Sequence, residues 1–137
     1  MTTIAVNRTT MAADTQMDED GLISYGRKIY TVNGDLIGFA GGVTEGLKFV
    51  EWYVDQEEEI DLDDTIAIVL TKHGEIFTYE SHLKMEVFGK HHAVGSGAQA
   101  ALAAMDCGHS PESAIKIASK RDAYTGSETI SVKINEK

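Results

Sequence analysis

The alternation of apolar and polar positions predicts that the first third of the chain forms paired strands. Two apolar segments, residues 3–6 and 10–13, flank Asn7-Arg8-Thr9 and indicate a first hairpin. Asn33-Gly34 lies between the alternating segments 28–32 and 36–39, and Asn-Gly in such a position is the strongest short-range signal for a hairpin. We therefore expect two hairpins before the first helix.

Apolar residues then recur at helical spacing. A first helix is expected to begin with Thr44 as its N-cap and to run to about Glu58. Trp52 and Tyr53 would lie on other faces of this helix, where subunit contacts are conceivable. The predicted core face consists of Leu47, Val50 and Val54.

The rest of the chain predicts a third hairpin, one more strand, two helices and a last strand. The hairpin joins residues 65–70 and 75–79, and the next strand covers 87–94. Gly108 ends the first of the two helices, and Ser110 caps the second. The predicted apolar faces are Ala98, Ala101, Leu102 and Met105 on the first helix, Ala114, Ile117 and Ala118 on the second, and Ile130, Val132 and Ile134 on the last strand.

Antiparallel hairpins with segregated helices are typical of the α+β class, with two sheets and helices outside them. The chain has 137 residues, which suits one domain covering 1–137. The net charge of −10 disfavours nucleic acid and anionic lipid as partners. Neither a membrane span nor a signal peptide is expected, and a single cysteine, Cys107, excludes an internal disulfide, so we expect a cytoplasmic protein.

Two polar features invite functional interpretations. The acidic segment Asp55 to Asp64 is best explained as a solvated connection, with a docking site for a basic partner as the alternative. His91 and His92 point to opposite faces of a strand, so they make a poor metal-chelating pair and no metal site is expected.

Thr2 is the first candidate for chemistry. Methionine aminopeptidases remove Met before a small residue, so loss of Met1 would make Thr2 the N-terminus. A terminal threonine carries a hydroxyl nucleophile and an amine, whose ordinary pKa of about 7.7–8.0 suits a base at neutral pH. The signal is weak by itself, because many chains begin with Met-Thr.

Asp14 and Lys28 strengthen this interpretation. Asp14 ends the first hairpin and would return beside Thr2, and Lys28 begins a strand placed to point at the same spot. A lysine beside the nucleophile lowers neighbouring pKa values and stabilises an alkoxide. The alternative is a surface salt bridge worth less than about 1 kcal/mol.

Glycines mark two further turns. Gly41, in Phe39-Ala40-Gly41-Gly42, lies at a strand-to-helix turn where a backbone N–H can face a substrate, although a simple tight turn is also compatible. Val94-Gly95-Ser96-Gly97-Ala98 follows a strand and opens a helix, which would suit a bound phosphate. The second segment lacks the lysine and the spacing of a P-loop.

Taken in order, these motifs resemble proteasome β-type subunits, and among them the HslV-type peptidases and their small relatives most of all. The resemblance runs from Thr2 to Ile134. It rests on Thr-Thr-Ile-Ala-Val, Ala-Ala-Asp-Thr-Gln, Lys-Ile, Gly-Phe-Ala-Gly-Gly, Val-Gly-Ser-Gly and Arg-Asp-Ala-Tyr-Thr-Gly.

The resemblance implies a role for each matching residue. Thr2 would be the nucleophile, Asp14 and Lys28 would tune it, and Gly41 would bind the oxyanion. Ser96, Asp122 and Thr125 would complete a hydrogen-bonded shell near the terminal amine.

The resemblance also implies a fold and a reaction. The fold would be a shortened four-layer αββα sandwich of the N-terminal nucleophile hydrolase type, and the protein a threonine endopeptidase without cofactor or metal. Its substrates would be polypeptides, its subunits would form a homo-oligomeric ring, and an ATP-dependent unfoldase is a possible partner. A small-amide hydrolase and an inactive assembly protein are the alternatives.

Two departures from the family pattern stand out. The hairpin between Thr2 and Asp14 is shorter than usual; loss of two residues from each strand would preserve the direction of every side chain. Only one helix, rather than a longer helical pair, is predicted between the Gly41-Gly42 turn and Thr65, which puts ring contacts in question.

Overall fold

The computed structural model describes residues 2–19 and 22–134, which form two main sheets, a small hairpin sheet and three helices. The four-stranded sheet has the order β10-β1-β2-β11 and the five-stranded sheet the order β5-β6-β7-β8-β9, with antiparallel pairing throughout. The strands of the first sheet are β1 (Thr3–Asn7), β2 (Thr10–Asp14), β10 (His91–Gly95) and β11 (Thr129–Lys133). Those of the second are β5 (Ile29–Val32), β6 (Asp35–Ala40), β7 (Leu62–Leu70), β8 (Ile76–Ser81) and β9 (Leu83–Val87).

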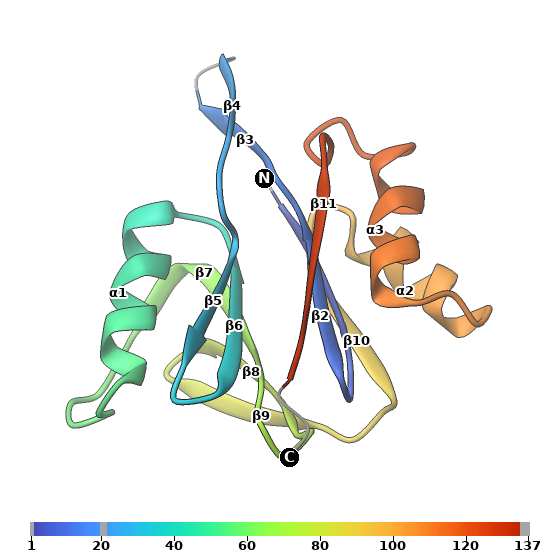
Figure 1. The fold of residues 1–137 in the computed structure, drawn as a ribbon. Coiled ribbons are helices and arrows are strands. Elements are labelled where there is room, and N and C mark those ends of the chain that lie inside the picture. The colour runs from blue at the N-terminus through green and yellow to red at the C-terminus, as the bar shows by residue number, and fades with distance from the viewer. Residues whose placement is uncertain (1, 20–21, 135–137) are drawn as a thin grey trace.

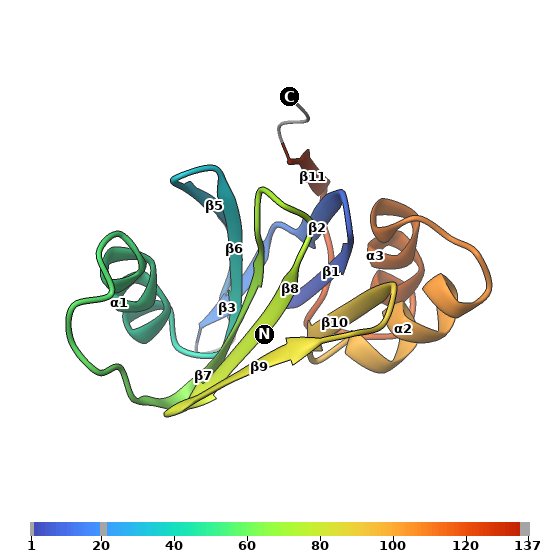
Figure 2. The same cartoon turned by 90° about the horizontal axis from the view of Figure 1, so that it is seen from below.

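Helices flank the two sheets on opposite sides (Figure 1). Helix α1 (Val43–Tyr53) packs on the five-stranded sheet, and α2 (Ala98–Asp106) and α3 (Pro111–Ser119) pack on the four-stranded sheet. Figure 2, turned by a right angle, shows the same separation, with α1 at one side and α2 and α3 at the other. The structure is therefore α+β, as predicted.

Alternating residues of β1 serve two different cores. Ile4 and Val6 belong to a buried cluster that also contains Ile68 and Leu70 of the opposite sheet, so this cluster fills the space between the sheets. Ala5 belongs instead to the cluster formed with α2 and α3. The period of two along a strand explains why an unbroken apolar segment here means burial on both faces.

The predicted hairpins are confirmed. Residues Asn33 and Gly34, with φ of 53° and 87°, connect β5 to β6. Both values lie in the left-handed region that a type I′ turn requires, which is why Asn-Gly predicted it. Ser110 caps α3 by accepting a hydrogen bond from the Ser113 N–H, and Pro111 is the first helical residue, also as expected.

The predicted orientation of α1 is wrong. Its buried face is Gly46, Phe49 and Tyr53, while Leu47 and Val54 are exposed. Gly46 gives no apolar signal in the sequence, yet the Phe39 ring packs directly on it: a Cβ there would lie 2.1 Å from the ring. The whole helix is rotated to accept this contact.

The ends of α1 also differ from the prediction. Gly42 rather than Thr44 occupies the N-cap position, and the helix ends at Tyr53 rather than near Glu58. The acidic residues that follow form an exposed connection to β7, as expected for a solvated segment.

Two further corrections concern strands. Residues 87–94 do not form one strand, because the chain bends between β9 and β10 as it passes from one main sheet to the other. The hairpin of β3 (Gln16–Glu19) and β4 (Leu22–Tyr25) was not predicted at all. Polar residues of β3 mask its strand pattern.

Candidate active site

A buried ion pair lies at the end of the β1–β2 hairpin. The Lys28 ammonium donates to Asp14 Oδ1 at 2.9 Å, and both side chains are almost fully buried. Lys28 also donates to the Gln16 carbonyl. Burial lowers the pKa of Lys28 from its ordinary value, although the nearby carboxylates of Asp14 and Asp18 act in the opposite direction. The alternative of a surface salt bridge is therefore wrong.

Asp14 connects this lysine to the first residues of the chain. Its Oδ1 also accepts the backbone N–H of Thr3 at 3.2 Å, and its Oδ2 accepts the N–H of Gly126 at 3.0 Å. Because the Thr3 N–H belongs to the Thr2–Thr3 peptide bond, a single carboxylate holds Lys28 and the carbonyl side of Thr2 in one cluster. The predicted proximity of Asp14, Lys28 and the chain start is confirmed.

Thr2 itself is held by its backbone and faces a cavity. Its carbonyl accepts the Ser96 N–H at 2.9 Å. Gly95 permits this approach, because it has φ of 104° and a Cβ there would lie 1.7 Å from the Thr2 oxygen. The cavity has a volume of about 490 Å³, and Asp18, Ser24 and Gly41 are among its other lining residues. Met1 lies outside the described residues.

A chain of hydroxyl groups supports the same region from the other side. The Thr125 hydroxyl donates to Asp122 Oδ2 at 2.6 Å and lies 2.7 Å from Thr3 Oγ1. Ser96 also donates its hydroxyl to Asp122. Burial raises the pKa of Asp122, but the hydrogen bonds from Ser96, Thr125 and the Tyr124 N–H outweigh it and leave the pKa below its ordinary value. The structure thus brings Ser96, Asp122 and Thr125 together.

Thr3 and Gln16 are parts of this site that the sequence did not reveal. Thr3 Oγ1 accepts the Gly97 N–H at 2.9 Å in addition to its contact with Thr125. The Gln16 amide donates to the Ala123 carbonyl at 3.1 Å and so ties β3 to the loop after α3. In the sequence, only the position of Thr3 directly after Thr2 pointed to a role for it, because its partners Gly97 and Thr125 are distant in the chain.

Gly41 lines the Thr2 cavity from the opposite sheet. It has φ of 121°, and a Cβ there would lie 2.2 Å from the Asp64 carbonyl oxygen. The position therefore requires glycine on steric grounds. Gly41 and Thr2 therefore line the same cavity from different sheets.

A second cavity of about 640 Å³ shares Gly41 and Asp18 with the first. Its lining includes Asp63, Asp64 and Glu80 but neither lysine nor arginine. The surroundings of the candidate nucleophile are therefore strongly acidic apart from Lys28.

The interpretation of residues 94–98 as a phosphate site loses support. The N–H groups of Ser96 and Gly97, which would hold a phosphate at the start of α2, already bind Thr2 O and Thr3 Oγ1. His91 contacts Asp106 at 2.6 Å, and the described part of the chain contains no group of three potential metal-binding side chains. Within residues 2–19 and 22–134, no helix has the length and apolarity needed to cross a bilayer.

Comparison with known structures defines the fold. The chain is similar to Thiobacillus denitrificans BPH, with 17% identity, a TM-score of 0.76 and coverage of 98% of this chain and 100% of that one. BPH in complex with epoxomicin matches at 16% identity and a TM-score of 0.73, covering 98% of this chain and 99% of that one. HslV from Trypanosoma brucei matches at 18% identity and a TM-score of 0.78, with the same coverage of 98% and 99%.

No protein-family model and no curated protein sequence matches this chain. The structural similarity extends over nearly the whole chain, so the protein has the fold of HslV-type and proteasome-type peptidases. The resemblance inferred from the sequence motifs is thereby confirmed at the level of the fold.

Proposed function

We propose that the protein is a threonine-type endopeptidase that hydrolyses peptide bonds through Thr2 once Met1 has been removed. One observation carries this proposal: Asp14 Oδ1 binds both the buried ammonium of Lys28 and the peptide N–H that follows Thr2. Burying a lysine and a carboxylate costs desolvation free energy, and titratable groups perturbed in this way cluster at functional sites. The similarity to BPH bound to epoxomicin supports the same reaction class.

The proposed reaction uses the chain's own groups only. The Thr2 hydroxyl attacks the substrate carbonyl, and the free amine of Thr2 takes the hydroxyl proton. The Gly41 N–H stabilises the oxyanion, and the amine returns the proton to the leaving amine. Water then cleaves the resulting ester and regenerates Thr2. The Lys28 charge stabilises the developing alkoxide, and Ser96, Asp122 and Thr125 orient the amine.

The proposed assembly is a homo-oligomeric ring of subunits with a shortened four-layer αββα sandwich fold, and an ATP-dependent unfoldase would supply polypeptide substrates. The separation of α1 from α2 and α3 by two sheets supports the layer order. Exposed apolar residues on the β3–β4 hairpin and on α1 support subunit contacts, since such residues gain from being covered.

Mass spectrometry with epoxomicin tests the catalytic proposal. We expect the native protein to lack Met1 and to form one covalent adduct on Thr2. Thr2→Ala should lose both the adduct and peptidase activity, with a loss of about 10³-fold or more. Thr9→Ala, which alters an exposed threonine in the first turn, is the matched control. A native protein that retains Met1, or a Thr2→Ala variant with full activity, would refute the proposal.

The acidic cavity beside Gly41 predicts the charge preference of the enzyme. Peptides with lysine or arginine should be cleaved faster than matched peptides with glutamate. Asp63→Asn combined with Glu80→Gln should reduce this preference by up to about thirtyfold, because two exposed charge pairs contribute at most about 1 kcal/mol each. Glu112→Gln on α3 is the control, and kcat/KM for the peptide pair is the measurement.

A further inference from the structure

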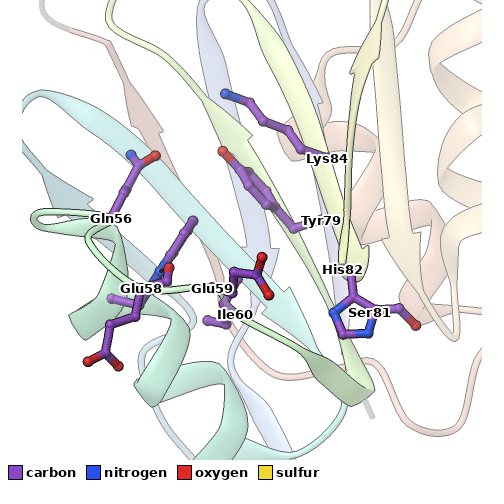
Figure 3. A pocket seen from close by; sticks show the side chains of 9 residues that line it. Gln56, Glu58, Glu59, Ile60, Tyr79, Ser81, His82 and Lys84 are labelled. Atoms are coloured by element: carbon purple, nitrogen blue, oxygen red, sulfur yellow. Dashed lines mark hydrogen bonds between the residues drawn. The ribbon is translucent and has the colours of Figure 1, made fainter.

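A third cavity lies on the face of the five-stranded sheet that packs against α1. It has a volume of about 570 Å³ and opens between the connection after α1 and strands β8 and β9 (Figure 3). Trp52, Ile60 and Tyr79 supply its apolar surface, and Glu58, Glu59 and Lys84 supply its charges. It shares no residue with the cavity that Thr2 lines.

Tyr79 offers an unused hydrogen-bonding group to this cavity. Only 5% of the residue is exposed, and its ring packs on Phe49 and Trp52 with centroid separations of 4.9 and 6.0 Å. Its hydroxyl has no hydrogen bond to any described residue, and burial raises the pKa of Tyr79 to about 12, so the hydroxyl keeps its proton. Among the described residues no buried side-chain oxygen or nitrogen lacks a partner, so the Tyr79 hydroxyl is not a buried unpaired group but reaches the open cavity, where it can bond to a ligand.

The rim contributed by the connection is acidic and well held. The Trp52 indole N–H donates to the Glu58 carbonyl at 2.5 Å, and the Asn33 amide donates to the Val54 carbonyl at 3.4 Å. Residues 55–64 include no lysine or arginine, and the structure shows no lysine or arginine paired with Glu58 or Glu59 among the described residues. Figure 3 shows the Glu59 carboxylate on the side of the loop that faces the strands, whereas the Glu58 carboxylate points away from Tyr79 and Lys84.

The opposite wall has a different character. Lys84 places its ammonium 4.3 Å from the centre of the Phe77 ring and 5.7 Å from that of Tyr79. This contact shows that the aromatic surface of β8 attracts a cation. Because Lys84 comes from β9 and the carboxylates come from the connection, the cavity has a cationic side and an anionic side. Figure 3 shows the Lys84 side chain on the strand side and Glu58 and Glu59 on the loop side.

We propose that this cavity binds a basic segment of a partner protein through one arginine or lysine side chain. The cationic group would lie against Trp52 near the Glu59 carboxylate, with its alkyl stem on Ile60 and the more distant charge of Glu58 adding to the attraction. A neighbouring carbonyl of the segment would accept hydrogen bonds from the Tyr79 hydroxyl and from Lys84. Charge complementarity identifies the occupant, since the chain's own net charge of −10 opposes binding of a second copy through this acidic rim.

Trp52 makes the proposal directly measurable, because it is the only tryptophan of the chain. We expect a blocked tetrapeptide with one arginine to change Trp52 fluorescence saturably at concentrations below about 1 mM. The same peptide with citrulline, which has the same shape and no charge, should bind about tenfold more weakly. The arginine peptide should also bind more weakly at higher salt.

Variants separate the two sides of the cavity. Glu58→Gln with Glu59→Gln should weaken the arginine peptide about tenfold and remove its advantage over the citrulline peptide. Tyr79→Phe removes only the hydroxyl and should weaken both peptides equally by a few-fold. Glu112→Gln, on the distant helix α3, should change nothing, and thermal unfolding verifies that each variant is folded.

Two results would overturn the proposal. One is equal binding of the arginine and citrulline peptides, and the other is the absence of saturable binding both by fluorescence and by calorimetry. Thr2→Ala should bind the arginine peptide normally, so the outcome does not depend on the peptidase proposal.

Discussion

The β1–β2 and β3–β4 hairpins follow one another with a single residue between them, yet their environments are opposite. The first lies in the middle of the four-stranded sheet, with β10 and β11 on its edges and apolar layers on both faces. The second forms a sheet of its own and projects from the body of the molecule (Figure 1). Leu22, on the projecting hairpin, is 74% exposed.

The two hairpins differ in which side chains they bury and which they expose to solvent. At the end of β1–β2, the charged group of Asp14 is buried, because Lys28 and two backbone N–H groups pair with it. On β3–β4, the apolar side chains of Leu22, Ile23 and Tyr25 are exposed. Strand pairing alone therefore does not determine burial; the surrounding layers do. The first hairpin ends at a buried ion pair, and the second exposes apolar side chains.

Of the substitutions considered, removal of Lys28 should lower the free energy of unfolding the most. Lys28→Ala leaves the Asp14 charge buried without its cation, which typically destabilises a protein by about 3–5 kcal/mol. Denaturant unfolding measures the loss. Lys116→Ala is the control, because Lys116 is exposed and its pairing with Glu112 at 3.5 Å should contribute less than about 1 kcal/mol. Equal effects of the two variants would contradict the buried pair.

The same distinction between covered and open surface can be tested within α1. Phe49→Ala should cost about 3–5 kcal/mol, since Phe49 is fully buried against the five-stranded sheet. Leu47→Ala, on the exposed face, should change the free energy of unfolding by less than about 0.5 kcal/mol. A larger effect for Leu47 would restore the orientation predicted from the sequence.

Enlarging a residue of β2 should sharpen the comparison further. Ala12 is fully buried against α2 and α3, so Ala12→Leu should destabilise the fold by about 1–3 kcal/mol through overpacking. Ala103→Leu makes the same change at an exposed position of α2 and serves as control. Thermal unfolding compares the two, and a neutral Ala12→Leu would show that the helices can move away.

The smallest effect on stability is expected on the projecting hairpin. Ile23→Ser should change the free energy of unfolding by less than about 0.5 kcal/mol, because Ile23 is exposed. If the hairpin forms subunit contacts as proposed, the same variant should shift the assembly towards monomers in sedimentation velocity. Thr9→Ser is the control, and an unchanged assembly in Ile23→Ser would exclude the hairpin from the contacts.

The parts of the molecule that the sequence predicted depend on short-range effects. Asn33-Gly34 specifies its turn because few residues tolerate two positive φ angles, and Ser110-Pro111 specifies the start of α3 through a cap and a preset backbone angle. The proximity of Asp14 to the start of the chain was also predictable, since a short hairpin returns Asp14 to that point.

Tertiary structure alone decided the rest, because the relevant contacts join residues distant in the chain. The Phe39 ring on Gly46 sets the rotation of α1, and glycine leaves no trace in an apolar pattern. The bond between Thr3 and Thr125 spans almost the whole chain. By itself, the sequence determined three of the hairpins, the start of α3 and the candidate nucleophile with its lysine and acid. Only the packing of the layers decided which face of each helix and strand is buried, since burial depends on the elements that pack on it.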